Sequence, residues 1–333
     1  MGSRTHDLDV IILGQGLVGS LLAWRLLQRG QRVLVIDDGH RSAASRAAAG
    51  LINPLAGLRF SIPPRVRAWL SHSKDTYAQL ETELATRLYY PRDMLRLFRS
   101  PAQRERYARR AAQAEAWGLV RQTVTAEAPG EPVVAPCGGV LQSGTGHLEV
   151  ALLLDRLQPW LCARGAYQRR PVNYAEIHPD AKGVRLGDLR AHRLVCCEGR
   201  RVLQNPWFAH LPWRCNQGEL LRLRADGPLP QRIVNGAHWI IPLADGSLRL
   251  GATHDPARQD EQTTPGARAQ LLDGLQALLG HRPTLQVLEQ RGGVRPGVRD
   301  AAPILGQHPN APGLWLCNGF GARGSLTAPW YTD

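Results

Sequence analysis

The chain has 333 residues, of which 43% are hydrophobic and 21% are charged, the balance of an ordinary globular protein. This composition excludes a collagen-like chain, a disordered tail and a small disulfide scaffold, and the length indicates about two domains. The formal net charge of +13 is carried almost entirely by arginine, which fits either a polyanionic partner such as nucleic acid or a generally basic surface.

The first elements along the chain predict a strand–helix–strand unit. Residues 8–13 (LDVIIL) are a short, β-branched apolar run, typical of a buried parallel strand. A glycine-rich turn follows at residues 14–19 (GQGLVG), and an apolar pattern at helical spacing then continues to Gly30. Residues 32–36 (RVLVI) predict a second buried strand.

The rest of the chain predicts further helices and an antiparallel meander. Helical patterns are expected over about 66–88, 101–117, 146–163 and 265–279, and strands are expected within 123–140, from Val172, and over 186–190 and 193–197. Residues 215–253 alternate between apolar and polar positions around a hairpin turn at 244–246.

The spacing Gly14-x-Gly16-x-x-Gly19 predicts a dinucleotide-binding turn, because it lies between a strand and a helix. Gly14 permits the tight turn, Gly16 lets the backbone approach a pyrophosphate, and Gly19 allows close packing of helix on strand. The pyrophosphate would lie on the unpaired N–H groups at the start of the helix. The expected cofactor site also includes the intervening residues Gln15, Leu17 and Val18.

An acidic pair closes the second strand. Asp37 stands 18 residues after Gly19 and is followed by Asp38, at the place where a carboxylate accepts hydrogen bonds from a ribose diol. FAD, NAD and NADP share the glycine fingerprint, but an acid at this position disfavours the 2′-phosphate of NADP. The N-terminal unit therefore leaves FAD and NAD open.

Three further segments decide between these cofactors. They are residues 45–51 (SRAAAGL), residues 293–297 (GVRPG) with Asp300 and Pro303, and residues 319–324 (GFGARG) with Ala328 and Pro329. Together with the N-terminal unit, they resemble the D-amino-acid oxidase and glycine oxidase superfamily of FAD enzymes over about residues 8–330. The resemblance implies FAD as the cofactor.

The resemblance also implies a fold of the mixed α/β class with two discontinuous domains. A Rossmann-like FAD-binding domain is expected from residues 1–82, 141–205 and 290–333. An antiparallel-sheet substrate or cap domain is expected from residues 83–140 and 206–289.

Site residues follow from the same resemblance. The cofactor is expected to contact Ser45, Arg46, Ala49, Gly50, Val172, Gly199, Gly319, Phe320, Gly321, Ala322, Arg323, Gly324, Ser325 and Leu326. Oriented N–H groups in the last of these segments would stabilise the negative charge that a flavin ring gains on reduction. Arg295 is the one catalytic residue expected, as the anchor of a substrate carboxylate. His238 and Trp239 are weaker candidates to face the flavin.

The activity that this resemblance implies is oxidation of a C–N bond in an amino acid or N-substituted glycine, by hydride transfer to the flavin. The ending GFGARGSLTAP is also similar to the FAD domain of the bifunctional tRNA 5-methylaminomethyl-2-thiouridine biosynthesis enzyme. A tRNA wobble-uridine modifying oxidoreductase is therefore the alternative, and a basic surface would suit tRNA. A non-catalytic FAD-binding accessory protein is a third hypothesis.

The remaining features indicate the surroundings of the protein. Six cysteines are scattered without a CxxC pair, which predicts free thiols, and no metal site is expected. No apolar run is long enough to span a bilayer, and the N-terminal stretch does not have the pattern of a signal peptide. We therefore expect a cytoplasmic protein whose partner is a small amine or amino acid, with tRNA as the less favoured partner.

Overall fold

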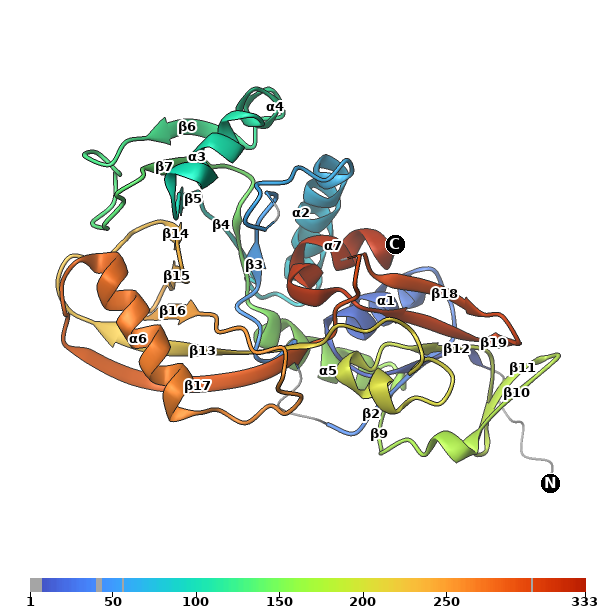
Figure 1. The fold of residues 1–333 in the computed structure, drawn as a ribbon. Helices are drawn as coiled ribbons and strands as arrows, with labels where there is room; N and C mark the ends of the chain where they lie inside the picture. The colour runs from blue at the N-terminus through green and yellow to red at the C-terminus, as the bar shows by residue number, and fades with distance from the viewer. Residues whose placement is uncertain (1–7, 40–43, 56, 301) are drawn as a thin grey trace.

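The computed structural model describes residues 8–39, 44–55, 57–300 and 302–333, whose strands gather into two eight-stranded sheets and one three-stranded sheet. Figure 1 shows the two large sheets as separate bodies, one built mainly from the two ends and the middle of the chain, the other from the segments between. This confirms the mixed α/β fold class with a Rossmann-like part and an antiparallel part.

The first sheet has a parallel core formed by β1, β2, β9, β12 and β19. Its spatial order is β10 (Ile177–Asp180), β11 (Gly183–Leu186), β12 (Leu189–Cys196), β1 (Leu8–Leu13), β2 (Val33–Asp37) and β9 (Tyr167–Arg169), with β19 (Ala311–Asn318) beside β12 and β18 (Ile304–His308) beside β19. Leu13 pairs with both Ile36 and Cys196, and Cys196 pairs with Leu316, so that these parallel strands end along one edge. That edge is where α/β sheets bind nucleotides.

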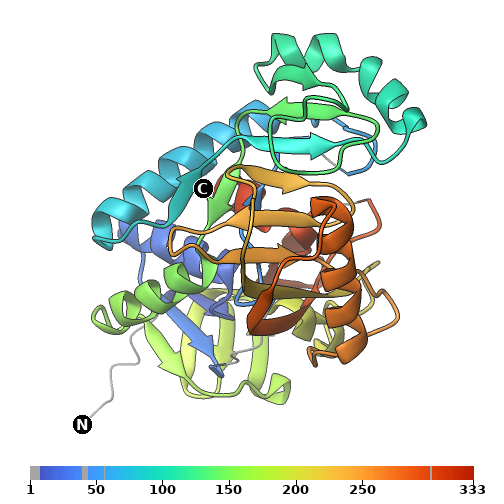
Figure 2. The same ribbon diagram turned by 90° about the vertical axis from the view of Figure 1, so that its left-hand side faces the viewer.

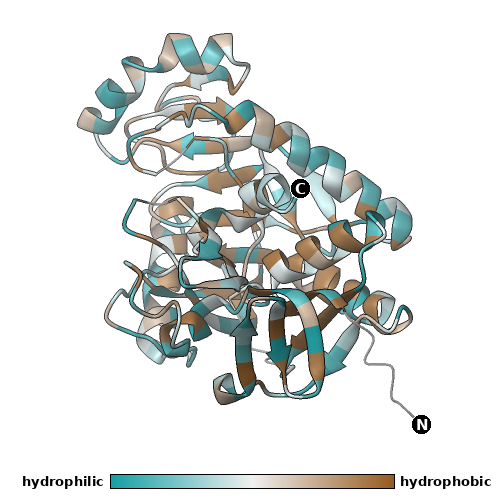
Figure 3. Cartoon of the chain, turned by 90° about the vertical axis from the view of Figure 1, so that its right-hand side faces the viewer, coloured by the Kyte–Doolittle hydropathy of each residue, from teal (hydrophilic) through white to brown (hydrophobic). Residues whose placement is uncertain are grey.

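Helices cover this sheet because its strands are apolar on both faces. They are α1 (Leu17–Gln28) and α5 (Val150–Cys162), while α7 (Gly324–Tyr331) packs on α1 and on α2 (Val66–Glu83). The short 3₁₀ segments in this part of the chain are η1 (Tyr174–Glu176), η2 (Gly199–Gln204) and η3 (Gly321–Arg323). Figure 3 shows apolar residues running through the strands and polar residues frequent on the loops around them. Trp24 of α1 is buried within this layer.

The second sheet is antiparallel except where β14 pairs with β5. Its order is β17 (Leu285–Arg295), β13 (Asn216–Ala225), β16 (Leu248–Gly251), β15 (Trp239–Pro242), β14 (Ile233–Asn235), β5 (Met94–Leu97), β7 (Gly139–Gln142) and β6 (Val120–Val124). Helix α6 (Pro265–Leu279) packs Leu271 and Leu275 against one face of the sheet, and α3 (Pro101–Ala108) and α4 (Ala111–Ala116) lie near the β6–β7 end (Figure 2).

A small sheet and a long helix connect these two bodies. The small sheet is β3 (Leu51–Ile52), β8 (Gly146–Leu148) and β4 (Tyr89–Pro91), and the helix is α2 (Val66–Glu83). The buried hydroxyl of Tyr77 on α2 donates to the carbonyl of Ser325 at 2.6 Å, which fixes the start of α7. No helix in the described ranges is long and apolar enough to cross a membrane.

Several expected elements are confirmed, and others differ. Helix α6 has the expected bounds, and the turn at 244–246 joins β15 to β16. Residues 146–148 form β8 instead of the start of a helix, because His147 and Leu148 are buried between β3 and β4. Val172 begins no strand, since Pro171 has no N–H to donate to a neighbour. The helix expected over 101–117 is split into α3 and α4, a break that nothing in the sequence marks.

Candidate functional site

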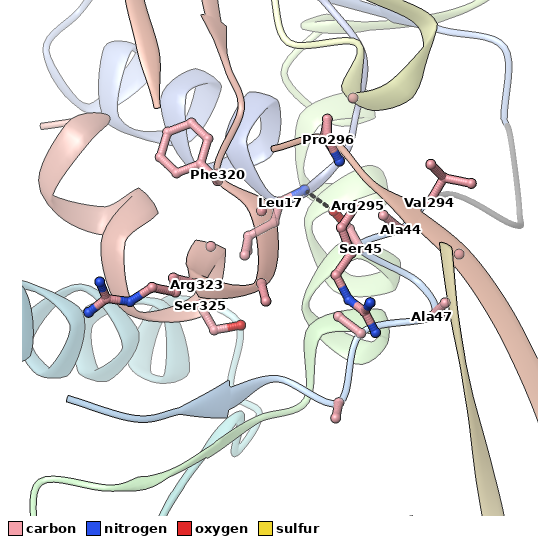
Figure 4. Close-up of a pocket in the computed structure, with 18 of the residues that line it drawn as sticks. Leu17, Ala44, Ser45, Ala47, Val294, Arg295, Pro296, Phe320, Arg323 and Ser325 are labelled. Atoms are coloured by element: carbon pink, nitrogen blue, oxygen red, sulfur yellow. Dashed lines mark hydrogen bonds between the residues drawn. The ribbon is translucent and has the colours of Figure 1, made fainter. Parts of the chain in front are cut away.

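A cavity of about 760 Å³ opens between the binding edge of the parallel sheet and the antiparallel sheet. Its wall is built from the glycine turn before α1, the loop before β3, strands of the second sheet, and the η3–α7 segment. Figure 4 shows Ser45, Arg295 and Phe320 coming together around it from widely separated parts of the chain. The loop-rich edge of one sheet and the face of the other thus make one site.

The glycine turn has the geometry that its sequence predicts. Gly14 has a φ of +99°, and a Cβ added to it would lie 2.6 Å from the carbonyl oxygen of Cys197, so a side chain does not fit there. A Cβ on Gly19 would overlap the carbonyl oxygen of Gly14, which is the close helix packing expected of the third glycine. At the start of α1, the N–H of Leu17 donates to Ser45 Oγ at 3.0 Å (Figure 4).

The acid at the end of β2 is fixed by backbone groups. Asp37 Oδ2 accepts from the N–H of Gln15 at 2.9 Å, and Oδ1 accepts from the N–H of Gly39 at 2.6 Å. Asp38 forms an ion pair with Arg201 of η2. Asp37 therefore connects the glycine turn to the second strand, and it is one of the residues that line the cavity.

Most of the residues expected at the site line this cavity. They are Gly14, Gly16, Leu17, Val18, Asp37, Asp38, Ser45, Ala49, Gly50, Val172, Gly199, Arg295, Phe320, Gly321, Ala322, Arg323, Gly324, Ser325 and Leu326. Although Val172 is not in a strand, it still contributes to the wall.

Four expected residues lie behind the wall. Gln15 donates its side-chain amide to the carbonyl of Leu154 on α5 at 3.1 Å. Arg46 forms an ion pair with Asp155 of the same helix at 2.7 Å. Gly19 packs on Gly14 as described above, and a Cβ on Gly319 would lie 2.8 Å from the Val298 side chain. From these positions, the four residues support the cavity wall.

Arg295, at the end of β17, is one of the cations that line the cavity. Its guanidinium lies directly over Gly218 of β13, and its Nη1 atom is buried without a hydrogen-bond partner. Burial lowers its pKa from the ordinary arginine value, yet an arginine stays charged at neutral pH. No carboxylate in the described part of the chain lies within ion-pair distance of it, so the cavity holds a cation ready for an anionic ligand.

Arg323 differs from Arg295 although both line the cavity. Figure 4 shows its side chain directed away from Arg295. The guanidinium lies 5.1 Å from the ring centre of Trp69, in a cation–π contact with α2. Arg323 therefore lines the cavity through its place in the turn between η3 and α7, and its guanidinium packs against Trp69.

Glu198 is an acid at the end of β12, in the wall of the cavity. It accepts from the hydroxyl of Tyr174 and from the side-chain amide of Asn205, each at 2.8 Å. Burial raises its pKa above the ordinary glutamate value. These two donors explain how an acid is accommodated at a place where the sequence analysis expects the backbone to approach the cofactor.

The sequence analysis missed Arg96, Arg99 and His254, which also line the cavity. Arg96 and Arg99 belong to β5 and the loop after it, and they reach the site because β5 pairs with β14. No sequence motif surrounds these residues. Only the pairing of β5 with β14, two strands far apart in the sequence, indicates that they reach the cavity. His238 and Trp239 do line the cavity, as considered from the sequence. Among the described residues, no group of His, Cys, Asp or Glu is arranged to hold a metal ion.

A Rossmann-like sheet with a glycine fingerprint, which shares one cavity with an antiparallel sheet, is typical of a dinucleotide-dependent oxidoreductase. The family model described as "FAD dependent oxidoreductase" (DAO) matches residues 9–331, and the chain belongs to this family. It is therefore an enzyme that uses FAD, as the sequence resemblance implied.

Individual relatives agree with this assignment. The chain is 26% identical to a glycine oxidase of Geobacillus kaustophilus, covering 98% of this chain and 91% of that protein. It is also 26% identical to the tRNA 5-methylaminomethyl-2-thiouridine biosynthesis bifunctional protein MnmC of Marinobacter nauticus, where the match covers 96% of this chain and only 53% of the relative. A glycine oxidase crystal structure from G. kaustophilus has the same fold, with a TM-score of 0.86, 24% identity, and coverage of 98% and 93% of the two chains.

The cavity fits FAD on its own geometry. Gly14 and Gly16 leave the backbone bare at the start of α1, where a pyrophosphate binds, and Asp37 offers a carboxylate to a ribose. The η3–α7 segment, which carries Phe320, lines the far part of the cavity and can receive the flavin ring. One cavity thus includes both the glycine turn and Arg295 in its lining.

Proposed function

We propose that the enzyme oxidises the C–N bond of an amino acid or an N-substituted glycine. The observation that carries this proposal is Arg295, an uncompensated guanidinium in the cavity with a buried Nη1 that lacks a partner. A planar fork of N–H groups binds a carboxylate in one orientation and so fixes the position of the α-carbon beside it. The glycine oxidase relative, which matches along nearly the whole chain, supports the same substrate class.

Bound FAD supplies the electron acceptor for this oxidation. The protein's own groups hold the substrate and orient it. Arg295 binds the carboxylate, and Gly218 leaves room for its guanidinium. The imidazole of His254, whose pKa is lowered by partial burial and by the charge of Arg295, stays neutral at neutral pH beside the bound anion. A neutral amine in the substrate is the form that gives up electrons, so the arrangement needs no protein carboxylate as a base.

An anaerobic titration of the FAD-loaded enzyme tests the proposal. Glycine, N-methylglycine and a mixture of D-amino acids are added separately, and the visible flavin absorption is followed. Bleaching by any of them supports the proposal and identifies the substrate group. A flavin that remains oxidised with all three contradicts it.

The Arg295→Ala variant sharpens this test. It should raise KM for a carboxylate substrate about 100-fold, because removing one partner of a buried charge pair costs about 2–5 kcal/mol. The FAD content should not change, since Arg295 is placed at the substrate end. An unchanged KM would remove the anchor assignment.

A second candidate function is modification of a tRNA wobble uridine. The MnmC relative and the net charge of +13 favour it, although the chain spans about half the length of that relative. Binding of tRNA should then weaken steeply with added salt, because each neutralised phosphate releases counterions. Absence of salt-sensitive binding would exclude this candidate.

We also propose a cytoplasmic location. All six cysteines are free thiols, and Cys196, Cys197, Cys215 and Cys317 are buried. Unpaired thiols suit a reducing compartment. Fractionation of cells that express the protein tests this location.

A further inference from the structure

Besides Arg295, two further arginines line the cavity without an acidic partner among the described residues: Arg96 of β5 and Arg99 in the loop after it. Arg96 Nη1 donates to the carbonyl of Leu55 at 2.9 Å, and Nη2 donates to the carbonyl of Gly57. Arg99 Nε donates to the carbonyl of Gly236 at 2.8 Å, and its Nη2 donates to the carbonyl of Ala237 at 2.9 Å. Carbonyl groups satisfy N–H donors but carry no net charge, so neither guanidinium is neutralised.

The two arginines differ in burial and in the N–H groups that remain available to a ligand. Arg96 is buried, and burial together with the charge of Arg99 lowers its pKa to about 10. Its N–H groups are used by the carbonyls of Leu55 and Gly57. Arg99 is exposed at the rim, and its backbone bonds use only Nε and one N–H of Nη2. The edge formed by Nη1 and Nη2 is therefore available to a ligand.

Arg99 and Arg295 line the same cavity from different elements, the loop after β5 and the end of β17. Partial burial lowers the pKa of His254, and the charges of Arg295, His238 and Arg99 each lower it further. His254 lines the same cavity as Arg295 and Arg99.

Acidic residues in this part of the wall have partners elsewhere. Glu219 is almost fully buried, forms an ion pair with Arg258 at 3.3 Å and accepts from the backbone N–H of Thr264 at 3.0 Å. Glu261 also has a partner of its own. The charges of Arg99 and Arg295 therefore remain unbalanced within the described structure of the cavity.

We propose that the substrate carries two carboxylates, an α-carboxylate bound by Arg295 and a second carboxylate bound at the rim by Arg99. This inference rests on the proposed function for its first half. The second half follows from the uncompensated guanidinium of Arg99, its available Nη1–Nη2 edge and its place in the lining of the cavity that also holds Arg295. The substrate class is then an amino or imino diacid, and a simple amino acid would leave Arg99 without a ligand.

Equilibrium binding to the FAD-loaded enzyme tests the inference without requiring oxidation. Glutarate, adipate and pimelate are compared with pentanoate, hexanoate and heptanoate, in which a methyl group replaces the second carboxylate. The dissociation constants are measured by calorimetry and by perturbation of the flavin spectrum. At least one diacid should bind ten-fold more tightly than its monoacid of equal length, and the best length reports the separation of the two arginines.

Variants of Arg99 assign the preference to this residue. In Arg99→Gln, the diacid should lose at least ten-fold more affinity than the monoacid. Arg99→Lys should recover part of the preference, because it restores the charge without the fork. Arg109→Gln is the matched control, since Arg109 is an exposed arginine of the same sheet domain outside the cavity. Melting temperatures of all variants confirm that they fold.

The outcomes separate this inference from the proposed function. Equal binding of diacids and monoacids by the wild-type enzyme overturns it, as does a diacid preference that persists in Arg99→Gln. Oxidation of N-methylglycine with no preference for diacids would support the proposed function and exclude the second carboxylate site. An Arg99-dependent diacid preference in an enzyme that oxidises none of the tested amines supports the site and contradicts the proposed substrates.

Discussion

Arg295 lies over a glycine, Gly218, whose added Cβ would overlap both Nη atoms of the guanidinium. The antiparallel register of β13 and β17 pairs Gly218 with Gly293, two residues before Arg295, so the side chain reaches back across the neighbouring strand. The same added Cβ would lie 2.5 Å from the carbonyl of Thr253. Gly218 therefore makes the space in which the Arg295 guanidinium lies.

Replacing Gly218 with alanine should displace Arg295 without removing it. The Gly218→Ala variant is expected to raise KM for a carboxylate substrate about ten-fold or more, since overpacking costs about 1–3 kcal/mol. FAD content should be retained, because the glycine turn that receives the cofactor is elsewhere. Steady-state kinetics and the flavin-to-protein ratio measure the two effects.

The control for this variant is Gly266→Ala on α6. A Cβ on Gly266 would meet no atom within 4 Å, and its φ is ordinary for an alanine. It should leave KM unchanged. If both variants behave alike, Gly218 does not position the anchor.

Asp37 should determine affinity for FAD. Its carboxylate accepts from the backbone of Gln15 and Gly39 and faces the cavity at the end of β2. Asp37→Ala is expected to weaken FAD binding about 10–100-fold, because hydrogen bonds to a charged group contribute about 1.5–3 kcal/mol. Titration of apoprotein with FAD, followed by flavin fluorescence, gives the dissociation constants. Asp188→Ala, in an exposed turn outside the cavity, is the control, and equal affinities in the two variants would contradict the ribose assignment.

The sequence predicts the nucleotide half of this site better than the substrate half. Gly14, Gly16 and Asp37 are contributed by consecutive elements, so spacing alone brings them together. Arg99 and His254 come from elements that meet only through the pairing of β5 with β14 and the fold of the second sheet, and no local spacing encodes such pairings. Even within a recognised segment, the sequence can predict where the backbone lies without predicting what a side chain contacts. Arg323 lies on the expected turn, but its guanidinium packs on Trp69.

The junction between the two sheets should be sensitive to acid through Glu149. This residue precedes α5, and its carboxylate accepts from Arg249 of β16 at 2.5 Å and lies 3.4 Å from His147 Nε2. Burial alone would raise its pKa, but hydrogen bonds from His147 and Arg249 outweigh that effect and lower the pKa to about 2, from 4.5. The folded state therefore favours the carboxylate, and the associated stability is present above about pH 4.5 and is lost as the pH falls toward 2.

Glu149→Gln should lower the free energy of unfolding at pH 7 by up to about 3 kcal/mol, since one pKa unit corresponds to about 1.4 kcal/mol. The variant also leaves Arg249 largely buried without its acid. Urea unfolding of wild type and variant is measured at pH 7 and pH 3, with Glu105→Gln on the exposed face of α3 as the control. The difference between wild type and Glu149→Gln should shrink at pH 3, because below the ordinary pKa of 4.5 the unfolded wild-type chain binds a proton that the folded state, with a pKa of about 2, does not. A difference that stays constant between the two pH values would show that the carboxylate charge does not stabilise this junction.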